Sequence, residues 1–422
     1  MKPDDLPKQE LVNLAERCVA CGLCLPHCPT YRKTESEADS PRGRIQLMKG
    51  VLEQRIPLNA RFIEHIDLCL TCRACENVCP NSVAYGELVD GTRVFIEAAR
   101  PRNGTWLRDF ALREFIAKPW RLQPLVPLLR FYRRSGLQNL LRGSGILRAL
   151  GLHAIEQHLP LLAQNTGWKE IYPAHGEVRG EVALFLGCVA RVTDASTLYA
   201  AIFVLNHLGY SVHVPRGQTC CGALHQHSGD LEKAKNLARE NLRVFSAPNL
   251  AAIISTASGC GATLAEYKLL LGDEARVLAG KVRDLSGFLE QDKNINKINI
   301  LQLDAKIAVH DPCTLRNVLH GEKSPYDLLK LIPRAQIIAL AGNDQCCGAA
   351  GTYFLSQPQM AQKLRADKIA ALRTSGASWL ATSNIGCALH LAAGIRAAGL
   401  AVKIAHPVTL LARQMGFDDD AG

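Results

Sequence analysis

The sequence predicts an α+β multidomain protein, with an all-helical N-terminal domain followed by two repeated α/β domains that have parallel sheets. Two observations predict this architecture. A cysteine frame of the form C-x2-C-x2-C-x3-C-P occurs twice between residues 18 and 80. Further along the chain, a different cysteine pattern occurs twice among segments that alternate between strand-like and helix-like character. Such alternation is typical of a parallel sheet flanked by helices.

Each N-terminal frame predicts an iron–sulfur cluster. This spacing holds [4Fe–4S] clusters in bacterial ferredoxins, where the fourth cysteine of each run ligates the cluster of the other run. Three thiolates at this spacing can bind three iron corners of one cube, and the fourth cysteine faces away. The first predicted cluster is held by Cys18, Cys21, Cys24 and Cys79. The second is held by Cys69, Cys72, Cys75 and Cys28. The crossed ligands would keep the two clusters close enough to exchange an electron.

Zinc and disulfides explain these cysteines less well. Paired C-x2-C units do bind structural zinc, but a zinc site does not need a third cysteine at this spacing followed by Cys-Pro. Residues 1–9 are charged and contain no apolar segment of a signal peptide, so nothing predicts export to an oxidising compartment where disulfides form. We therefore expect metal-bound cysteines and a cytoplasmic location.

Composition excludes other classes of protein. The chain has 422 residues, enough for two or three domains with cores of their own. No apolar run approaches the length of a membrane span. The formal charge of +10 could suggest nucleic-acid binding, but no helix-turn-helix or zinc-finger frame accompanies it. We expect no nucleic-acid partner.

Helix signals fill the first predicted domain, residues 1–100. A short helix is expected over 11–17, before the first cysteine run. Ser40 and Pro41 suit the N-cap and the first position of a second helix, and a third is expected near 59–68. For Arg42-Gly43-Arg44, beside the cysteine runs, two interpretations stay open: charge compensation or docking at the clusters, and a solvated helix start.

Residues 101–178 predict a basic amphipathic helical connector. Arginines outnumber acids there, aromatic residues accompany them, and prolines at 119, 124 and 127 divide the segment. Such a segment can lie peripherally on an anionic membrane surface, which here would be the inner face of the cell membrane. It can equally pack on a partner subunit or connect two domains.

The remaining chain is an internal repeat with an offset of 125 to 127 residues. We call its two copies the first CCG repeat (179–300) and the second CCG repeat (301–422), after the Cys-Cys-Gly triplet in each. Strands are expected over 182–186, 211–214 and 251–256 in the first copy, and over 306–309, 336–340 and 378–381 in the second. The cysteines of the first copy are Cys188, Cys220, Cys221 and Cys260. Those of the second are Cys313, Cys346, Cys347 and Cys387.

The cysteines of each copy are expected to meet in one crevice. Each follows a strand and precedes a helix, and ligands of open α/β sheets bind outside the carboxyl ends of the strands. Adjacent helix N-termini should lower the thiol pKa values, and Gly222 and Gly348 should allow the tight turns. The crevice could hold a further iron–sulfur cluster, a zinc ion or a redox disulfide. His225, His227 and His310 are expected beside these cysteines rather than as ligands.

Together these motifs resemble the iron–sulfur subunit of glycolate oxidase. The resemblance rests on both cysteine runs, the Ser40–Ile45 segment between them, and strings such as Cys220-Cys221-Gly222-Ala223-Leu224, His310-Asp311-Pro312-Cys313 and Gln345-Cys346-Cys347-Gly348. The wider group includes subunits of lactate oxidation systems, anaerobic glycerol-3-phosphate dehydrogenase and heterodisulfide reductase. One departure is that Cys260 and Cys387 stand alone, where heterodisulfide reductase has a C-x2-C pair.

The resemblance implies an oxidoreductase subunit that relays electrons and has no catalytic residue of its own. FAD-binding partner subunits would oxidise glycolate, and this chain would pass their electrons toward a quinone or another respiratory acceptor. No dinucleotide-binding glycine fingerprint occurs at a strand–helix junction, which agrees with a flavin held by partners. The alternatives are a thiol/disulfide or quinone reductase acting at the CCG sites, and a subunit of a lactate or glycerol-3-phosphate dehydrogenase.

Overall fold

The computed structural model describes residues 8–99, 121, 127–128, 131–132, 135–144, 156–159, 167–247 and 249–418. Residues 8–99 form helices and turns and contain no strand. The four longer helices of this region are α1 (Lys8–Glu16), α3 (Pro41–Leu52), α4 (Ala60–Asp67) and α6 (Tyr85–Ala99). Shorter helical turns are α2 (Tyr31–Thr34), η2 (Glu37–Asp39) and α5 (Ala74–Asn77). This confirms the predicted all-helical region.

Local capping explains where two of these helices begin. The Ser40 hydroxyl accepts a hydrogen bond of 2.9 Å from the backbone N–H of Gly43, with Pro41 in the first turn of α3. The Asn59 side chain caps α4 in the same way, accepting from the N–H of Phe62 at 3.0 Å. Apolar residues from all four helices then meet in one core, including Leu11, Met48, Ile66 and Leu88. This core holds the loops that carry the cysteine runs.

The rest of the described chain contains two sheets and the helices around them. The first has the strand order β1-β3-β2-β4-β5, with β1 (Ile171–Tyr172), β2 (Gly180–Phe185), β3 (Tyr210–His213), β4 (Leu250–Ser255) and β5 (Val282–Asp284). The second has the order β7-β6-β8-β9, with β6 (Lys306–His310), β7 (Gln336–Ala339), β8 (Trp379–Thr382) and β9 (Lys403–Ala405). All pairings are parallel except the antiparallel pairing of β1 with β3.

Helices connect the strands of each sheet. Those of the first CCG repeat are α13 (Ala190–Thr193), α14 (Ala195–His207), α15 (Ala223–Gln226), α16 (Leu231–Val244), α17 (Ser258–Ala265), α18 (Tyr267–Leu271), η3 (Gly272–Ala275), α19 (Arg276–Lys281), α20 (Leu285–Glu290) and η4 (Ile295–Lys297). Those of the second CCG repeat are α21 (Cys313–Asn317), α22 (Ser324–Lys330), α23 (Tyr353–Ser356), α24 (Pro358–Ser375), α25 (Ile385–Ala397) and α26 (Pro407–Gln414).

The two CCG repeats have the same topology and pack reciprocally. The order β3-β2-β4-β5 of the first corresponds to β7-β6-β8-β9 of the second. Helix α14 packs on α26 of the second repeat, and the equivalent helix α22 packs on α20 of the first. Buried residues from both repeats therefore join one core, among them Leu198, Leu205, Val309 and Leu411. The repeats are two halves of one packed unit.

The strands predicted from the sequence are confirmed within two residues at each end. Three short strands went unpredicted: the two-residue β1, and β5 and β9 with three residues each. These runs are too short to display a period, and each joins a sheet next to a longer strand. Tertiary pairing, rather than local pattern, creates them.

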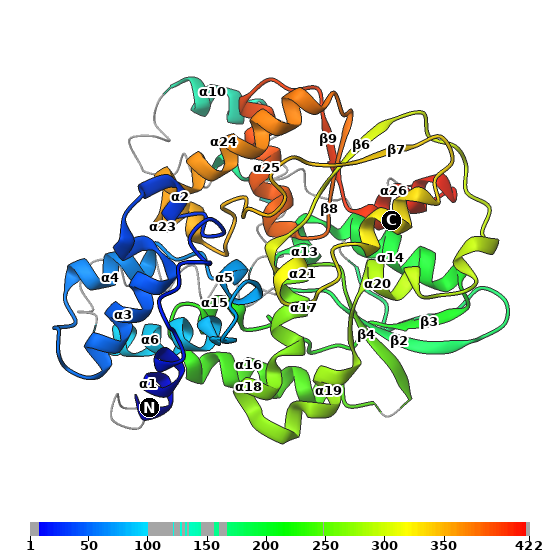
Figure 1. The fold of residues 1–422 in the computed structure, drawn as a ribbon. Helices are drawn as coiled ribbons and strands as arrows, with labels where there is room; N and C mark the ends of the chain where they lie inside the picture. Colours follow the sequence, from blue (N-terminus) through cyan, green and yellow to red (C-terminus); the bar gives the residue numbers. More distant parts are fainter. Residues whose placement is uncertain are drawn as a thin grey trace.

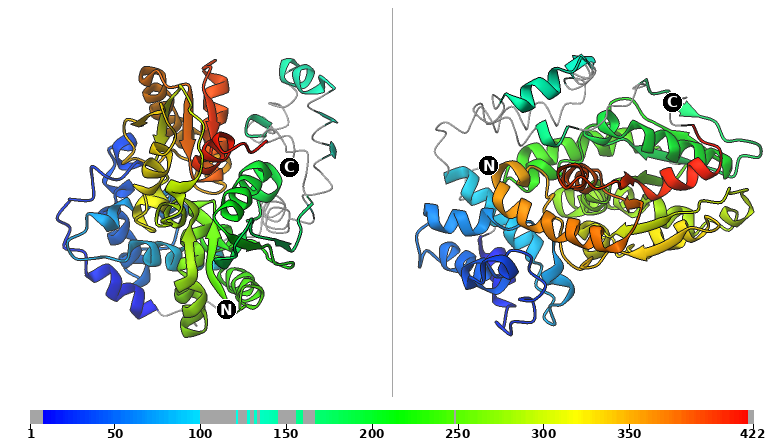
Figure 2. Two further views of the ribbon diagram at one scale, coloured as in Figure 1. Left: turned by 90° about the vertical axis from the view of Figure 1, so that its right-hand side faces the viewer. Right: turned by 90° about the horizontal axis from the view of Figure 1, so that it is seen from above.

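The helical region lies beside the two CCG repeats rather than apart from them. In Figure 1, the helices α1, α3, α4 and α6 lie to one side, with α5 beside α21 and α17 near the middle of the molecule. Both views in Figure 2 keep the helical region on one flank of the α/β unit. The second cysteine run consequently contacts the second CCG repeat.

The predicted connector lies mostly outside the described residues. Of its residues, α10 (Leu137–Gly143) is a described helix. The expected membrane contact of the arginine-rich segment also falls on residues that are largely undescribed. No helix in the described ranges is both long and apolar enough to span a membrane.

Candidate metal centres

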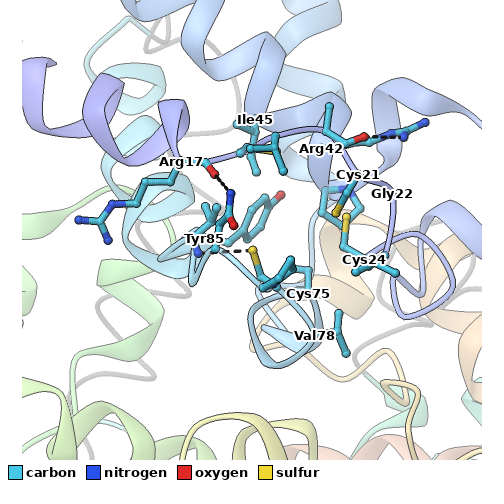
Figure 3. A pocket seen from close by; sticks show the side chains of 18 residues that line it. Arg17, Cys21, Gly22, Cys24, Arg42, Ile45, Cys75, Val78 and Tyr85 are labelled. Atoms are coloured by element: carbon cyan, nitrogen blue, oxygen red, sulfur yellow. Dashed lines mark hydrogen bonds between the residues drawn. The ribbon is translucent and has the colours of Figure 1, made fainter.

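A first cavity lies at the first cysteine run. It measures about 450 Å³, and its lining includes Ile45, Tyr85 and five cysteines: Cys18, Cys21, Cys24, Cys75 and Cys79. Figure 3 shows the labelled Cys21, Cys24 and Cys75 around this cavity, together with Tyr85 and Ile45. The structure thus gathers three cysteines of the first run with the fourth cysteine of the second run.

A second cavity lies at the second run. It measures about 310 Å³, and its cysteines are Cys28, Cys69, Cys72 and Cys75. Cys28 is the fourth cysteine of the first run, so each cavity combines three cysteines of one run with the fourth of the other. Cys75 lines both cavities, which are therefore adjacent. All-thiol donor sets of four in each cavity fit the predicted [4Fe–4S] clusters. The ligand assignment itself stays a prediction.

The chain wraps each cavity by the same backbone geometry. Ala20 and Gly22 in the first run have φ angles of +55° and +85°, and the corresponding Thr71 and Arg73 have φ angles of +52° and +59°. Left-handed conformations are costly for residues other than glycine and persist where surrounding structure requires them. Their recurrence at matching positions shows that both runs form the same loop, which turns successive sulfur atoms toward one point.

Arg44 is buried beside Cys28, with only 1% of its surface exposed. Its Nε donates to the His65 carbonyl oxygen at 2.7 Å, and its Nη1 donates to the Thr30 hydroxyl at 3.0 Å and lies 3.9 Å from the Cys28 sulfur. A solvated helix start is therefore wrong for Arg44, and charge compensation beside the cysteines fits. Burial opposes its charge, but the surrounding groups Tyr85, Cys69, Cys28 and Asp39 raise its pKa above the ordinary value.

Burial raises the pKa of three thiols of this region. It raises the pKa of Cys24 to about 11 and the pKa values of Cys72 and Cys75 well above the ordinary value. A bound metal cation inverts this preference, because coordination deprotonates a thiol outright. The buried sulfurs are thus suited to a metal and poorly suited to acting as free thiolates.

Two further residues, which were not predicted from the sequence, support these loops. The Tyr85 hydroxyl donates to the Cys69 sulfur at 3.6 Å. Arg93 is buried and donates to the carbonyl oxygen of Cys69 at 2.7 Å and to the Thr71 hydroxyl at 2.7 Å. A signal for Arg93 existed, because it interrupts the apolar face of α6 made by Val89 and Ile96, and a lone arginine on a buried face needs polar partners.

The four cysteines of the first CCG repeat also come together. Cys188, Cys220 and Cys221 are buried in one apolar cluster, which Cys260 joins from the first turn of α17. Cys220 interacts with both Cys188 and Cys221, and Cys221 interacts with Cys260. Gly222 has a φ of +91°, as the predicted tight turn requires.

The second CCG repeat repeats this arrangement with one addition. The sulfurs of Cys313 and Cys346 lie 4.0 Å apart, and Cys347 interacts with Cys346 and Cys387. His310 joins them: its ligand atom and the sulfurs of Cys347 and Cys387 all lie within 4.8 Å of one another. Burial lowers the pKa of His310 to about 3, which keeps its imidazole neutral.

The thiol pKa values at the CCG sites were expected to be lowered, and only some of them are. Hydrogen bonds from neighbouring thiols lower the pKa of Cys221 and of Cys346 well below the ordinary value. The same thiol–thiol interactions, together with burial, raise the pKa of the partners Cys220, Cys260, Cys313 and Cys347. The predicted lowering is therefore wrong for these four, because thiols this close share their protons.

The second cavity and the second CCG site are neighbours. Cys72, from the cavity, and Cys313 pack against a cluster that contains Leu70, Cys346 and Tyr353. The Tyr353 hydroxyl donates to the Leu68 carbonyl oxygen at 2.8 Å. Electrostatic repulsion from Cys346 helps to raise the Cys72 pKa, after the larger effect of burial. Thus the second cavity adjoins the second CCG site through packed side chains.

The first CCG repeat contacts the helical region through ion pairs. Arg73 pairs with Glu266, and the half-buried carboxylate of Asp90 lies 3.0 Å from Nδ1 of His227. Burial opposes the charge of Asp90, but His227 and Arg93 hold the pKa of Asp90 below its ordinary value. His227 therefore contributes to the interface between the two regions.

Fold and cysteine geometry together define a protein with a two-cluster ferredoxin region joined to two cysteine-rich α/β domains. Comparison with protein families agrees. The 4Fe-4S dicluster domain matches residues 14–83, and the cysteine-rich domain matches residues 182–265 and 307–392. The linker region of the glycolate oxidase iron-sulfur subunit matches residues 103–159, within the predicted connector.

Individual relatives agree with these matches. The chain is 36% identical to the probable glycolate oxidase iron-sulfur subunit of Bacillus subtilis over 410 residues, which is 94% of this chain and 91% of that relative. It is 34% identical to the glycolate oxidase iron-sulfur subunit of Escherichia coli over 92% of each chain. Lactate utilization protein A of Halalkalibacterium halodurans is 28% identical over 56% of this chain and 97% of its own length. The chain belongs to the family of glycolate oxidase iron–sulfur subunits.

Proposed function

We propose that this chain is the electron-transfer subunit of a glycolate oxidase complex. Electrons from FAD on partner subunits would pass through two [4Fe–4S] clusters toward a quinone or another respiratory acceptor. The observation that carries the proposal is the pair of adjacent cavities, each lined by three cysteines of one run and the fourth of the other. The family membership supports glycolate as the substrate of the complex.

The chain's own residues supply binding and electrostatics. Each cluster, when bound, accepts and releases one electron at a time. The eight ferredoxin cysteines would hold the clusters as thiolates, and Arg44 beside Cys28 would offset part of their negative charge. Tyr85 and Arg93 fix the loop at Cys69. In this proposal all of these groups serve the clusters, and substrate oxidation belongs to the partner subunits.

The first cavity offers the more open access for a partner. Cys21 is exposed, and the neighbouring apolar residues Val19 and Leu23 expose 64% and 57% of their surface. Exposed apolar side chains next to a redox site favour a docking surface for the electron donor. The second cavity is instead packed against the second CCG repeat. Electrons would therefore enter at the first run and move toward the second.

The test is reconstitution from separately purified subunits. The iron–sulfur chain, purified without oxygen, should contain about eight irons in the ferredoxin region and should not oxidise glycolate with an artificial acceptor. Adding the flavin subunits should allow glycolate to reduce the clusters of the iron–sulfur chain. Bleaching of their visible absorbance measures this reduction. Glycolate oxidation by the isolated chain, or clusters that stay oxidised in the complete complex, would contradict the proposal.

A second candidate is reduction of a disulfide or quinone at the CCG sites. The observation that favours it is the adjacency of Cys72 and Cys346, which would give electrons a route into the second CCG site. Replacing Cys220 and Cys346 by Ser should then abolish turnover while the ferredoxin clusters stay intact. Unchanged turnover in that variant would exclude this function.

A further inference from the structure

The two CCG repeats differ at one position beside their cysteines. The last residue of β6 is His310, which pairs in register with Thr382 of β8. At the equivalent place in the first repeat, the last residue of β2 is Phe185, which pairs with Ser255 of β4. An imidazole thus replaces a phenyl ring at the same end of the same strand. The second site therefore has a potential nitrogen ligand at a place where the first site has none.

The His310 ring is held in a fixed orientation. Its Nδ1 lies 3.0 Å from the Thr382 hydroxyl, and the residue is 2% exposed. Its Nε2 is buried and has no hydrogen-bond partner in the part of the chain that the structure describes. An unpaired buried polar atom is costly, and metal-ligating histidines characteristically use one ring nitrogen for such an orienting bond and the other for the metal.

The spacing of the donors fits a single ion. The ligand atoms of His310, Cys347 and Cys387 lie within 4.8 Å of one another, and all three residues are buried. In a tetrahedral zinc site, with Zn–S of about 2.3 Å and Zn–N of about 2.0 Å, ligand atoms lie about 3.5–4 Å apart. A small adjustment would bring the three atoms onto one ion. Among the described residues, no other group of three such side chains is this compact, including the ferredoxin cysteines.

We propose that the second CCG repeat binds one Zn²⁺ ion through His310, Cys347 and Cys387, and that the first repeat does not. Thiolate and imidazole ligands together are the donor set that zinc prefers in proteins. Cys346, which interacts with Cys347, is the neighbouring thiol for the fourth position. The ion has a structural role there, because it ties β6 to the start of α25 and to the Cys346-Cys347 turn.

The competing occupant is a further iron–sulfur cluster. A cube places its cysteines on separate iron corners, as in the ferredoxin runs, whose sulfurs are not gathered into a compact group of three. A donor triad close enough for one ion, with an imidazole in it, favours zinc. The inference does not rest on the electron-transfer proposal, since a zinc ion carries no electron.

The experiment measures zinc and iron per full-length chain after purification without oxygen and equilibration with Zn²⁺ alone. We expect about one zinc per chain and a zinc X-ray absorption spectrum with both sulfur and nitrogen ligands. His310→Phe, which copies Phe185 of the first repeat, should weaken zinc binding at least about 10-fold and remove the nitrogen ligand. Iron content should not change.

A matched control is His225→Gln in the first repeat. His225 is also buried, with one ring nitrogen near Asp230 and the other without a partner, but it forms no compact group with cysteines. This control should keep its zinc, and Cys387→Ser should lose it. Absence of zinc from the unaltered chain, iron clearly above eight per chain, or full zinc retention in His310→Phe would each overturn the inference. Failure of the electron-transfer proposal would have a different readout, namely an iron content well below about eight per chain in the ferredoxin region.

Discussion

The Asn317 side-chain amide donates a 2.7 Å hydrogen bond to the carbonyl oxygen of Cys72. Asn317 ends α21, the short helix that begins at Cys313. Its Oδ1 also accepts a 2.9 Å hydrogen bond from Asn77. One buried side chain therefore joins the loop of the second cavity to the second CCG site. The ferredoxin region is thus fixed on the CCG repeats at the point where their cysteines approach each other.

Removing this link should loosen the second cluster. Asn317→Ala leaves the Cys72 carbonyl and the Asn77 amide without their partner, which should cost about 1–3 kcal/mol of stability. We expect a lower melting temperature and faster loss of the second cluster in air. The decrease of visible absorbance measures this loss. Asn236→Ala, at an exposed site on α16, is the control and should change neither. Equal cluster lifetimes in both variants would mean that the link has no role in cluster retention.

Arg44 should set the potential of the second cluster. Its charge lies beside Cys28, and removing a buried positive charge favours the oxidised cluster, which is less negative. Arg44→Met should therefore lower the second potential by on the order of 60 mV, equivalent to about 1.4 kcal/mol for one electron. Potentiometric titration of the reduced-cluster signal measures this shift.

Two variants separate charge from folding in that experiment. Arg44→Lys keeps the charge but cannot make both hydrogen bonds of the guanidinium, to the His65 carbonyl and the Thr30 hydroxyl, so the potential of this variant should stay closer to that of the unaltered chain. Arg55→Gln removes an arginine whose side chain is 63% exposed and should leave both potentials unchanged. A second-cluster potential that is the same in Arg44→Met and Arg55→Gln would show that Arg44 acts only in packing.

Much of this architecture could be predicted because its signals are local. Ser40 and Asn59 cap their helices through bonds to residues three positions away, and the longer strands carry continuous apolar runs. His310 was expected beside the cysteines of its repeat and Arg44 near the clusters, but the specific contacts of these two side chains could not be predicted in this way. Arg44 gains its role from Cys28 and His65, 16 and 21 residues away along the chain. His310 meets Thr382 on β8, Cys347 in a loop and Cys387 on α25, all of them distant in sequence.

The interfaces between the predicted domains could not be predicted either, because they join residues that are far apart in the sequence. The contact of Tyr353 with the Leu68 carbonyl joins residues 285 positions apart in the chain. Nothing in the sequence around either residue indicates the other. The repeat itself was visible, because its cysteines recur at a constant offset. The reciprocal packing of the two copies into one core emerged only from the structure.

Asp284 should make stability depend on pH. Its carboxylate caps α20 by accepting from the N–H groups of Ser286 and Gly287, but burial dominates and raises its pKa to about 7. A raised pKa in the folded state means full stability below the unfolded value of about 4, and a loss as pH rises from there to about 7. Asp284→Asn keeps a capping oxygen and should remove this dependence. Denaturant unfolding at pH 5 and pH 8 tests this. Relative to the unaltered chain, the variant should gain more free energy of unfolding at pH 8 than at pH 5. An equal gain at both pH values would contradict the raised pKa of Asp284.

Crossed ligation of the two clusters can be tested by non-additivity. If Cys28 ligates the cluster of the second run, Cys28→Ser and Cys72→Ser damage the same cluster. The double variant should then keep about four irons, as each single variant does. Combining Cys28→Ser with Cys21→Ser should remove both clusters. The opposite pattern, with Cys28 and Cys72 additive and Cys28 and Cys21 not, would show that each run holds its own cluster.

The surface at Val19 and Leu23 should decide how well the flavin subunits bind. Both side chains are exposed beside the first cavity, and a partner there would bury them next to Cys21. Val19→Asp with Leu23→Asp places two charges in that contact and should weaken association at least about 10-fold. Iron content should stay the same, because neither side chain is a ligand.

The matched control for this surface is Val277→Asp, since Val277 is 72% exposed on α19, away from the cysteine runs. Binding of the flavin subunits, measured by co-purification and by titration of glycolate-dependent cluster reduction, should fall in the double variant and not in the control. A specific loss would identify the first run as the entry point for electrons. If both variants bound the flavin subunits equally well, the flavin subunits would bind at another surface. The proposed direction of electron transfer, from the first cluster to the second, would then lose its support.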